Sequence, residues 1–134
     1  RKGKSKNSLG DFLAEKYKDN SPKFSKFRYD RIIEKTKKSS VVILICMQRD
    51  PLESIPEWEE IASVSMSVQN MWLMCTKLNI GSYWSSPKII NSIHEFTNLN
   101  KGEKCLGIFY MGNYDQEINT RTPGPIEDKV IWLD

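Results

Sequence analysis

The stretch QNMWLMCTKLNIGSYWSSP, residues 69–87, joins the end of a long apolar helix to a short extended segment. The helix is expected to begin at Trp58 and to end near Leu78, a length of roughly 30 Å at the usual rise per residue. Glutamates gather at its start and Lys77 stands at its end, as the helix dipole favours. Gly81 is available for a left-handed cap that ends the helix.

Between its charged ends, this helix carries apolar side chains on all sides. A helix that is apolar all round is normally buried all round. A chain of 134 residues has little other structure with which to cover it. The pattern therefore predicts a partner subunit, and a homodimer is the simplest form of it.

Two further runs predict strands. Residues 41–47 are β-branched and show no polar alternation, which is typical of a strand buried on both faces. Residues 104–110, Lys-Cys-Leu-Gly-Ile-Phe-Tyr, are mostly apolar and predict a second buried strand. Between the two strands, Ser86 is expected to act as the N-cap and Pro87 as the first residue of a helix that reaches Phe96.

The front of the chain is basic. Residues 1–40 hold 13 Lys and Arg against 5 Asp and Glu, whereas residues 41–134 hold 7 against 12. Two amphipathic helices are expected there, over residues 8–17 and 23–38, and solvated helices are the commonest origin of such a charge. A nucleic-acid surface is the alternative, because aromatic residues that could stack on bases are interleaved with the lysines. These residues are Tyr17, Phe24, Phe27 and Tyr29.

Cysteine and histidine usage excludes several classes of site. The three cysteines are far apart and form no C-x-x-C pair, which predicts reduced thiols and a cytoplasmic protein. His94 is the single histidine, so a histidine-based zinc site or a Ser-His-Asp triad is not expected. The longest apolar run is too short to span a bilayer, so no membrane partner is expected.

The C-terminal residues predict an arm. Residues 114–125 show little periodicity and contain Pro123-Gly124-Pro125, as an extended segment would. Residues 129–133 are apolar and prone to form a strand. A terminal strand of this kind must pair with something, and the sheet edge of a partner subunit is the natural candidate.

Several motifs in their order resemble one known family. They are Q-N-M at 69–71, G-S-Y-W-S-S-P at 81–87, G-x-x-Y-x-G-N at 107–113 and R-x-P…E-D-K-V at 121–130. Together they resemble the C-terminal portion of nitroreductase-family flavoproteins, and most closely the subgroup of putative NAD(P)H nitroreductases. The resemblance covers nearly the whole chain, although the family's N-terminal segment has no counterpart here.

The resemblance implies an α+β, nitroreductase-like, FMN-dependent fold with a central mixed or antiparallel sheet flanked by helices. Residues 1–134 would form one domain that is incomplete at its N-terminus. In the family, two such domains form an intertwined homodimer, so residues 114–134 would be the arm that reaches the partner subunit. FMN would lie in a cleft at the interface between the two subunits.

The resemblance also implies the cofactor-binding residues. Ser85 would offer its backbone N–H toward the reactive N5 of the flavin, Ser86 would supply a side-chain donor, and Trp84 could flank the isoalloxazine. Arg121 would reach the FMN phosphate, which suits its bidentate geometry. No metal and no catalytic residue beyond the flavin are expected. Taken alone, residues 84–86 fit a helix cap, a helix start and a core tryptophan better than a flavin contact, and Arg121 fits a surface residue equally well.

The resulting functional hypothesis is an oxidoreductase that passes electrons from NAD(P)H through FMN to a nitroaromatic, quinone or similar small acceptor by a ping-pong mechanism. A flavin reductase or a dehalogenase-type reaction on the same fold is the nearest alternative. An alternative of another class is a basic module that binds nucleic acid through residues 1–40.

Overall fold

The computed structural model describes residues 3–115 and 122–133. Among these residues, no helix is both long and apolar enough to cross a membrane. In chain order, the elements are α1 (Gly3–Asn20), α2 (Lys26–Lys38), β1 (Val41–Gln48), α3 (Glu57–Lys77), β2 (Gly81–Ser85), the 3₁₀ helix η1 (Lys88–Glu95), β3 (Glu103–Gly112) and the 3₁₀ helix η2 (Glu127–Lys129).

The three strands form one antiparallel sheet in the order β1-β3-β2. β3 is therefore the central strand, and both of its neighbours run antiparallel to it. The register of β1 shifts between Ile45 and Cys46, next to the pairing of Ile45 with Gly107. The sheet is thus antiparallel, one of the two arrangements that the sequence left open.

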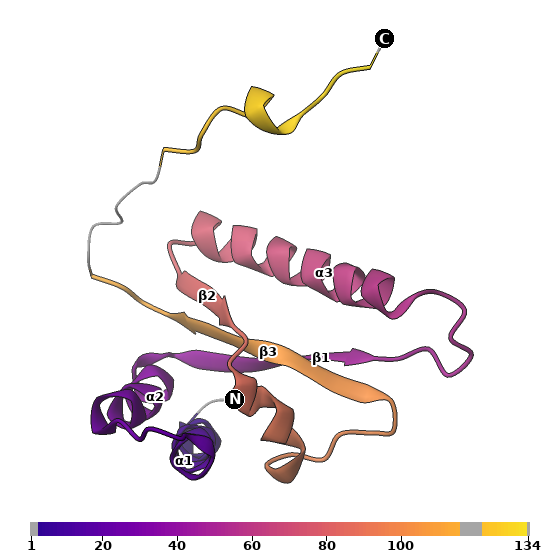
Figure 1. The fold of residues 1–134 in the computed structure, drawn as a ribbon. Helices are drawn as coiled ribbons and strands as arrows, with labels where there is room; N and C mark the ends of the chain where they lie inside the picture. The colour runs from indigo at the N-terminus through magenta and orange to yellow at the C-terminus, as the bar shows by residue number, and fades with distance from the viewer. Residues whose placement is uncertain (1–2, 116–121, 134) are drawn as a thin grey trace.

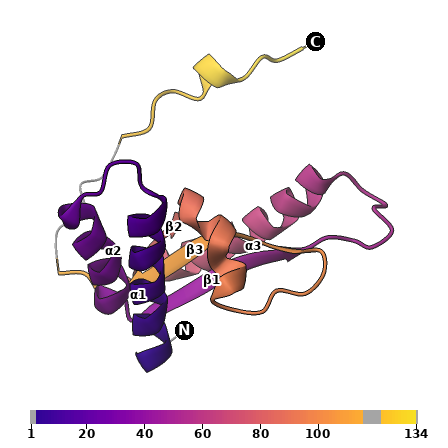
Figure 2. The same ribbon diagram turned by 60° about the horizontal axis from the view of Figure 1, so that its bottom comes forward.

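Helices cover the sheet on both faces. Figure 1 shows α3 on one face and α1, α2 and η1 on the other, and Figure 2 shows the second group from below. Each face has its own group of buried residues. We call the group between the sheet and α1, α2 and η1 the first cluster, with Leu13, Val42 and Ile108 in it. The second cluster lies between the sheet and α3 and includes Val68 and Phe109. Strands buried on both faces are therefore confirmed.

The face that carries α1 and α2 is tightly packed around α1. Leu9, Leu13 and Ala14 of α1 are at most 2% exposed. The two helices cross closely at Gly10, where a Cβ atom would lie 2.0 Å from Oγ1 of Thr36. Glycine is required at this position by the close approach of α2.

The boundaries of several elements differ from the expected ones. α1 extends beyond residues 8–17 in both directions, and α2 begins at Lys26 because Ser25 caps it by accepting a hydrogen bond from the N–H of Arg28. The segment after β2 is a 3₁₀ helix, and Ser86 is not its N-cap. Pro87 stays extended (φ −69°, ψ 150°), so the helix begins one residue later, at Lys88.

The cap of α3 was also predicted at the wrong residue. Asn79, with φ of 54°, adopts the left-handed conformation, whereas Gly81 does not. Asparagine tolerates this region because its short polar side chain can bond locally. Gly81 is needed for a different reason: a Cβ atom there would lie 2.8 Å from the ring of Tyr114.

A polar clip joins the first turn of α3 to the loop after β1. The Glu60 carboxylate accepts a hydrogen bond from Nη1 of Arg49 at 2.7 Å and another from the backbone N–H of Asp50 at 2.7 Å. Glu60 is 9% exposed, and Arg49 also donates to the carbonyl of Ile55. Both oxygens of this nearly buried carboxylate are therefore satisfied.

The outer side of α3 is bare in the single chain. The residues of α3 classed as buried are Glu60, Val68 and Cys75. Met66, Leu73 and Met74 are 64%, 57% and 56% exposed. Burial on all sides is therefore not achieved within one chain, and the predicted homodimer stays a prediction.

The C-terminal residues lie away from the body of the molecule (Figures 1 and 2). The strand expected over residues 129–133 does not form in this chain alone: η2 ends at Lys129, and no strand follows within residues 130–133. Ile131, Trp132 and Leu133 are 86%, 87% and 91% exposed. The partner subunit expected for this segment stays a prediction.

Candidate functional site

The candidate site is built around β2, which is an edge strand of the sheet. It pairs with β3 from Gly81 opposite Gly112 to Ser85 opposite Ile108. An edge strand presents alternate backbone N–H and C=O groups on the side away from the strand with which it pairs, and among the described residues β2 pairs with β3 alone. Backbone donors of the kind expected for a flavin-binding turn are consequently available along this edge.

Trp84 is held within the protein. Its ring packs against the second cluster, and a Cβ atom at Gly107 would lie 2.1 Å from its Nε1. This N–H is buried and, among the described residues, has no hydrogen-bond partner. Gly107 thus creates the space that Trp84 occupies, and the expected contact of the indole with a flavin stays a prediction.

Ser85 and Ser86 mark the end of β2. Ser85 is half-buried and Ser86 is exposed, in line with a turn open to a ligand. Because Ser86 does not cap η1, its hydroxyl is not committed to that helix. Arg121, the expected phosphate ligand, lies outside the described residues.

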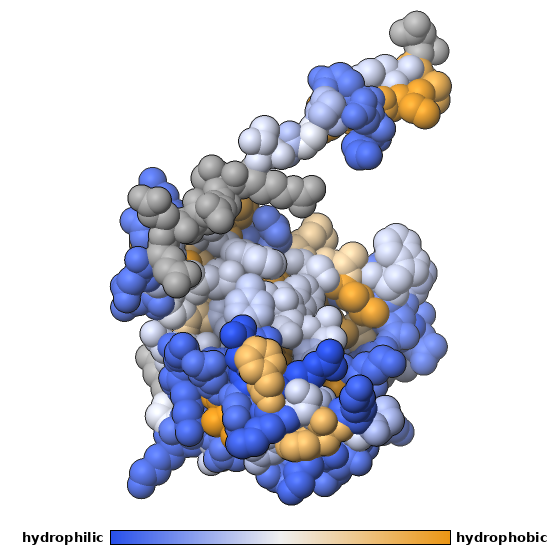
Figure 3. All heavy atoms as spheres, turned by 60° about the vertical axis from the view of Figure 1, so that its left-hand side comes forward, coloured by the Kyte–Doolittle hydropathy of each residue, from blue (hydrophilic) through white to orange (hydrophobic). Residues whose placement is uncertain are grey.

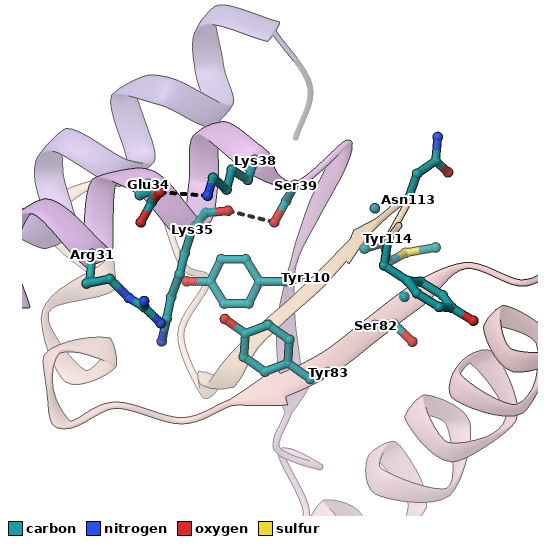
Figure 4. Close-up of a pocket in the computed structure, with 13 residues that line it drawn as sticks. Arg31, Glu34, Lys35, Lys38, Ser39, Ser82, Tyr83, Tyr110, Asn113 and Tyr114 are labelled. Carbon is teal, nitrogen blue, oxygen red and sulfur yellow. Dashed lines mark hydrogen bonds and ion pairs between the residues drawn. The ribbon is translucent and has the colours of Figure 1, made fainter. Parts of the chain in front are cut away.

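A cavity of about 530 Å³ opens on the other side of β2, between this strand and α2 (Figure 4). It is lined by the second half of α2, the first residues of β2 and the chain at the end of β3. The volume is within the usual range of small-molecule sites.

Two tyrosines lie at the bottom of this cavity. Tyr83 and Tyr110 are opposite one another on β2 and β3. Their rings are stacked, with centroids 5.0 Å apart and an interplanar angle of 14°. Burial raises the pKa of both phenols above the ordinary value, more strongly for Tyr110, which is 6% exposed. Both side chains therefore stay neutral hydrogen-bond donors at physiological pH.

Basic side chains of α2 form the wall of the cavity. Arg31, Lys35 and Lys38 lie on one side of the helix together with Glu34. Glu34 pairs with Lys38 at 2.7 Å, and this contact lowers the pKa of the carboxyl. In the described part of the chain, neither Arg31 nor Lys35 forms an ion pair, and Glu34 is the one carboxylate in the wall beside Arg31, Lys35 and Lys38, so the wall keeps a net positive charge.

Metal and thiol chemistry find little support. Within residues 3–115 and 122–133, no group of three potential metal ligands comes together. Desolvation, with a smaller effect of Cys105, raises the pKa of the Cys46 thiol to about 12. A thiol of this pKa is protonated at neutral pH and is a poor nucleophile.

Most aromatic residues of the basic segment make ring contacts or hydrogen bonds with other residues of the chain. Tyr17 packs against Phe24, which in turn contacts Tyr29. The hydroxyl of Tyr17 accepts a hydrogen bond from the N–H of Ser25, and that of Tyr29 donates to Glu15. The surface of this part, in the lower half of Figure 3, is largely hydrophilic with scattered apolar side chains. Phe24 and Phe27 remain 50% and 72% exposed, so the nucleic-acid alternative stays a hypothesis.

The family of the chain follows from a comparison of its sequence with family models. The model described as the nitroreductase family matches residues 1–113. The chain belongs to the nitroreductase family. A comparison with curated proteins gives no significant match.

Solved structures show the same fold. A nitroreductase-like family protein from Bacillus cereus superposes with a TM-score of 0.77 at 22% identity, covering 98% of this chain and 70% of that one. A BluB-like flavoprotein from Clostridium difficile 630 superposes with a TM-score of 0.60 at 15% identity, covering 97% of this chain and 75% of that one. The nitroreductase-like fold predicted from the motifs is confirmed.

Sequence reasoning missed the cavity between α2 and β2. The basic residues of α2 were interpreted as a solvated face or, alternatively, as part of a nucleic-acid surface, and Tyr83 and Tyr110 were quoted only as motif letters. The spacing of Arg31, Lys35 and Lys38 was a usable signal, because residues three and four apart share one side of a helix. Nothing in the sequence indicated which strand that side would meet.

Proposed function

We propose that this nitroreductase-family chain is an FMN-dependent oxidoreductase that transfers electrons from NAD(P)H to a small acceptor such as a nitroaromatic or a quinone. The observation that carries the proposal is the family match over residues 1–113. One structural neighbour, the BluB-like protein of Clostridium difficile 630, is a flavoprotein, which supports the choice of cofactor.

The donor set around β2 fits a flavin. The strand has a free edge, Ser85 and Ser86 lie at its open end, and the hydroxyl of Ser86 is not used as a helix cap. When bound, FMN would supply the hydride and electron transfer chemistry. The chain would supply backbone and hydroxyl donors at Ser85 and Ser86, a position held rigid by Trp84 against Gly107, and Arg121 for the phosphate.

A second copy of the chain would complete the site. The bare side of α3 and the exposed apolar residues 131–133 support this part of the proposal, because single chains seldom expose so many large apolar side chains together. In the proposed homodimer, these surfaces are covered by the partner, and the cleft between the subunits excludes water from the flavin.

The proposal is tested by titrating the full chain with FMN and recording the visible flavin spectrum, followed by NADH and NADPH oxidation with a nitroaromatic or quinone acceptor. A bound flavin whose spectrum shifts, and acceptor-dependent oxidation of either nucleotide, are expected. A chain that leaves the FMN spectrum unchanged and oxidises neither nucleotide contradicts the proposal.

Arg121→Gln is expected to weaken FMN binding by about tenfold or more, because a charge-assisted hydrogen bond to a phosphate contributes roughly 1.5–3 kcal/mol. Lys129→Gln is the matched control, since it removes one positive charge from the same C-terminal region. Riboflavin, which lacks the phosphate, should bind wild type and Arg121→Gln equally. Equal loss of FMN affinity in both variants would exclude a specific role for Arg121.

A further inference from the structure

Four hydrogen-bond donors face the cavity between α2 and β2. They are the guanidinium of Arg31, the ammonium of Lys35 and the hydroxyls of Tyr83 and Tyr110, all drawn in Figure 4. Nζ of Lys35 lies 5.8 Å from the centroid of the Tyr83 ring, and the charge of Arg31 acts on the Tyr83 hydroxyl. These groups come from three elements that are distant in the chain, α2, β2 and β3, and they share one space.

None of the four donors has an acceptor in the part of the chain that the structure describes. Arg31 and Lys35 form no ion pair there, and the two phenol hydroxyls make no hydrogen bond. The Tyr110 side chain is buried, but its hydroxyl is not sealed from solvent, so it opens into the cavity. Cζ of Arg31 also lies over the Phe27 ring, 5.8 Å from its centroid.

A group of donors without acceptors favours an anion. Two cations on one wall, neither of them in an ion pair, raise the local potential, and a bound anion relieves their mutual repulsion. Glu34 also interacts with the charge of Arg31, but its ion pair is with Lys38 at 2.7 Å, so it does not cancel the charges of both Arg31 and Lys35. The two neutral phenols can donate to the same anion, and their raised pKa values keep them protonated.

The floor of the cavity favours a planar ring beside that anion. Tyr83 is 38% exposed, so part of its ring remains accessible although one face stacks on Tyr110. Aromatic rings gain about 0.5–1.5 kcal/mol from offset or edge contacts with such a surface. The cavity of about 530 Å³ easily holds one aromatic ring and its substituent.

We propose that the cavity between α2 and β2 is a binding site for a small aromatic carboxylate, whose charged group lies between Arg31 and Lys35 and whose ring lies against Tyr83. This site is separate from the flavin-binding turn at Ser85 and Ser86. It does not require a bound flavin, so its test does not depend on the proposed redox function.

The proposal is tested by isothermal titration calorimetry of the full chain with benzoate, its neutral analogue benzamide, and inorganic phosphate. Benzoate is expected to bind about tenfold or more tightly than benzamide, the difference that one well-made charged hydrogen bond produces. It should also bind more tightly than phosphate, which lacks the ring. Binding of phosphate alone would overturn the aromatic part of the proposal.

Variants inside and outside the cavity show where benzoate binds. Arg31→Gln and Lys35→Gln should each weaken benzoate binding by about tenfold. Arg28→Gln and Lys37→Gln remove the same charges from α2 outside the cavity and should leave it unchanged. Tyr83→Leu should weaken benzoate binding but not phosphate binding. Circular dichroism of each variant confirms that the helices are retained.

Three results would overturn the proposal. One is the absence of benzoate binding at millimolar concentration, and another is an equal loss in the cavity variants and their controls. The third is competitive displacement of benzoate by FMN, which would make the cavity part of the flavin site. A chain that binds benzoate but no FMN would support this site while contradicting the proposed function.

Discussion

The two faces of the sheet are built differently. On one face, α1, α2 and η1 together close the first cluster, and Leu9 and Leu13 are almost completely buried. On the other face, α3 alone covers the second cluster, and its outer side leaves Met66, Leu73 and Met74 more than half exposed. The first face of the sheet is covered by three helices of the same chain. The second face is covered by the inner side of α3 alone, and the outer side of α3 stays exposed.

This difference distinguishes apolar surface that is buried within one chain from apolar surface that a partner would have to bury. Burial of apolar area is the main favourable contribution to folding. The first face obtains it from elements close in sequence to the sheet, since α1 packs extensively on α2, which leads directly into β1. The exposed apolar side chains on the outer side of α3 gain no such burial, and the apolar residues 131–133 also stay exposed. Both surfaces therefore have the composition of an interface.

The largest expected effect is on the closed face. Leu13→Ala should lower the free energy of unfolding by about 2–5 kcal/mol, because Leu13 is 2% exposed and its removal leaves a cavity. Leu73→Ala is the same substitution on the bare side of α3 and should cost less than about 0.5 kcal/mol. Urea unfolding at a protein concentration low enough to keep the chain monomeric measures both. Similar losses in the two variants would contradict the distinction between the faces.

A smaller effect is expected where α3 is attached to the loop after β1. Glu60→Gln keeps the shape of the side chain but removes the charge that pairs with Arg49 and accepts from the N–H of Asp50. The free energy of unfolding should fall by about 1–3 kcal/mol, the usual cost of leaving such a partner unsatisfied. Glu59→Gln, one residue away on the same turn, is the control and should be close to neutral. An equal response of the two variants would exclude the clip.

The smallest effect concerns the chemistry of Cys46 between the two clusters. Because its pKa is raised to about 12, iodoacetamide should alkylate Cys46 much more slowly in the folded protein than in urea at pH 8. The folded state holds this proton more tightly than the unfolded state, whose thiol titrates near 9.0. Its contribution to stability is therefore full below pH 9 and is lost as the pH rises toward 12. Mass spectrometry after timed alkylation identifies the site, and equal rates in the two states would contradict the assignment.

The sheet and α3 could be predicted from the sequence because their signals are local. A β-branched run identified β1, a mostly apolar run identified β3, and the charged ends of α3 marked its limits to within a residue. The motifs identified the family, although Arg121 and the partner subunit stay predictions. The position of the left-handed cap could not be predicted, because Asn79 and Gly81 both tolerate it and the contact of Gly81 with Tyr114 is not visible in the sequence.

The cavity could not be predicted for a related reason. Arg31 and Lys35 lie on one side of α2, and the spacing predicts that much. Their function depends on Tyr83 and Tyr110, which reach the same space only through the pairing of β2 with β3 and the packing of α2 beside them. Contacts between elements distant in the chain leave no periodic signal in either element.

The most direct test of the difference between the two faces is the mass of the full chain in solution, measured by sedimentation equilibrium alongside Leu73→Glu. The account predicts about twice the chain mass of 15.6 kDa for the wild type, and a mass near 15.6 kDa for the variant, because the charge would lie within the proposed interface. A wild type that stays at 15.6 kDa at all concentrations would contradict it, since the bare side of α3 would then belong to a stable monomer.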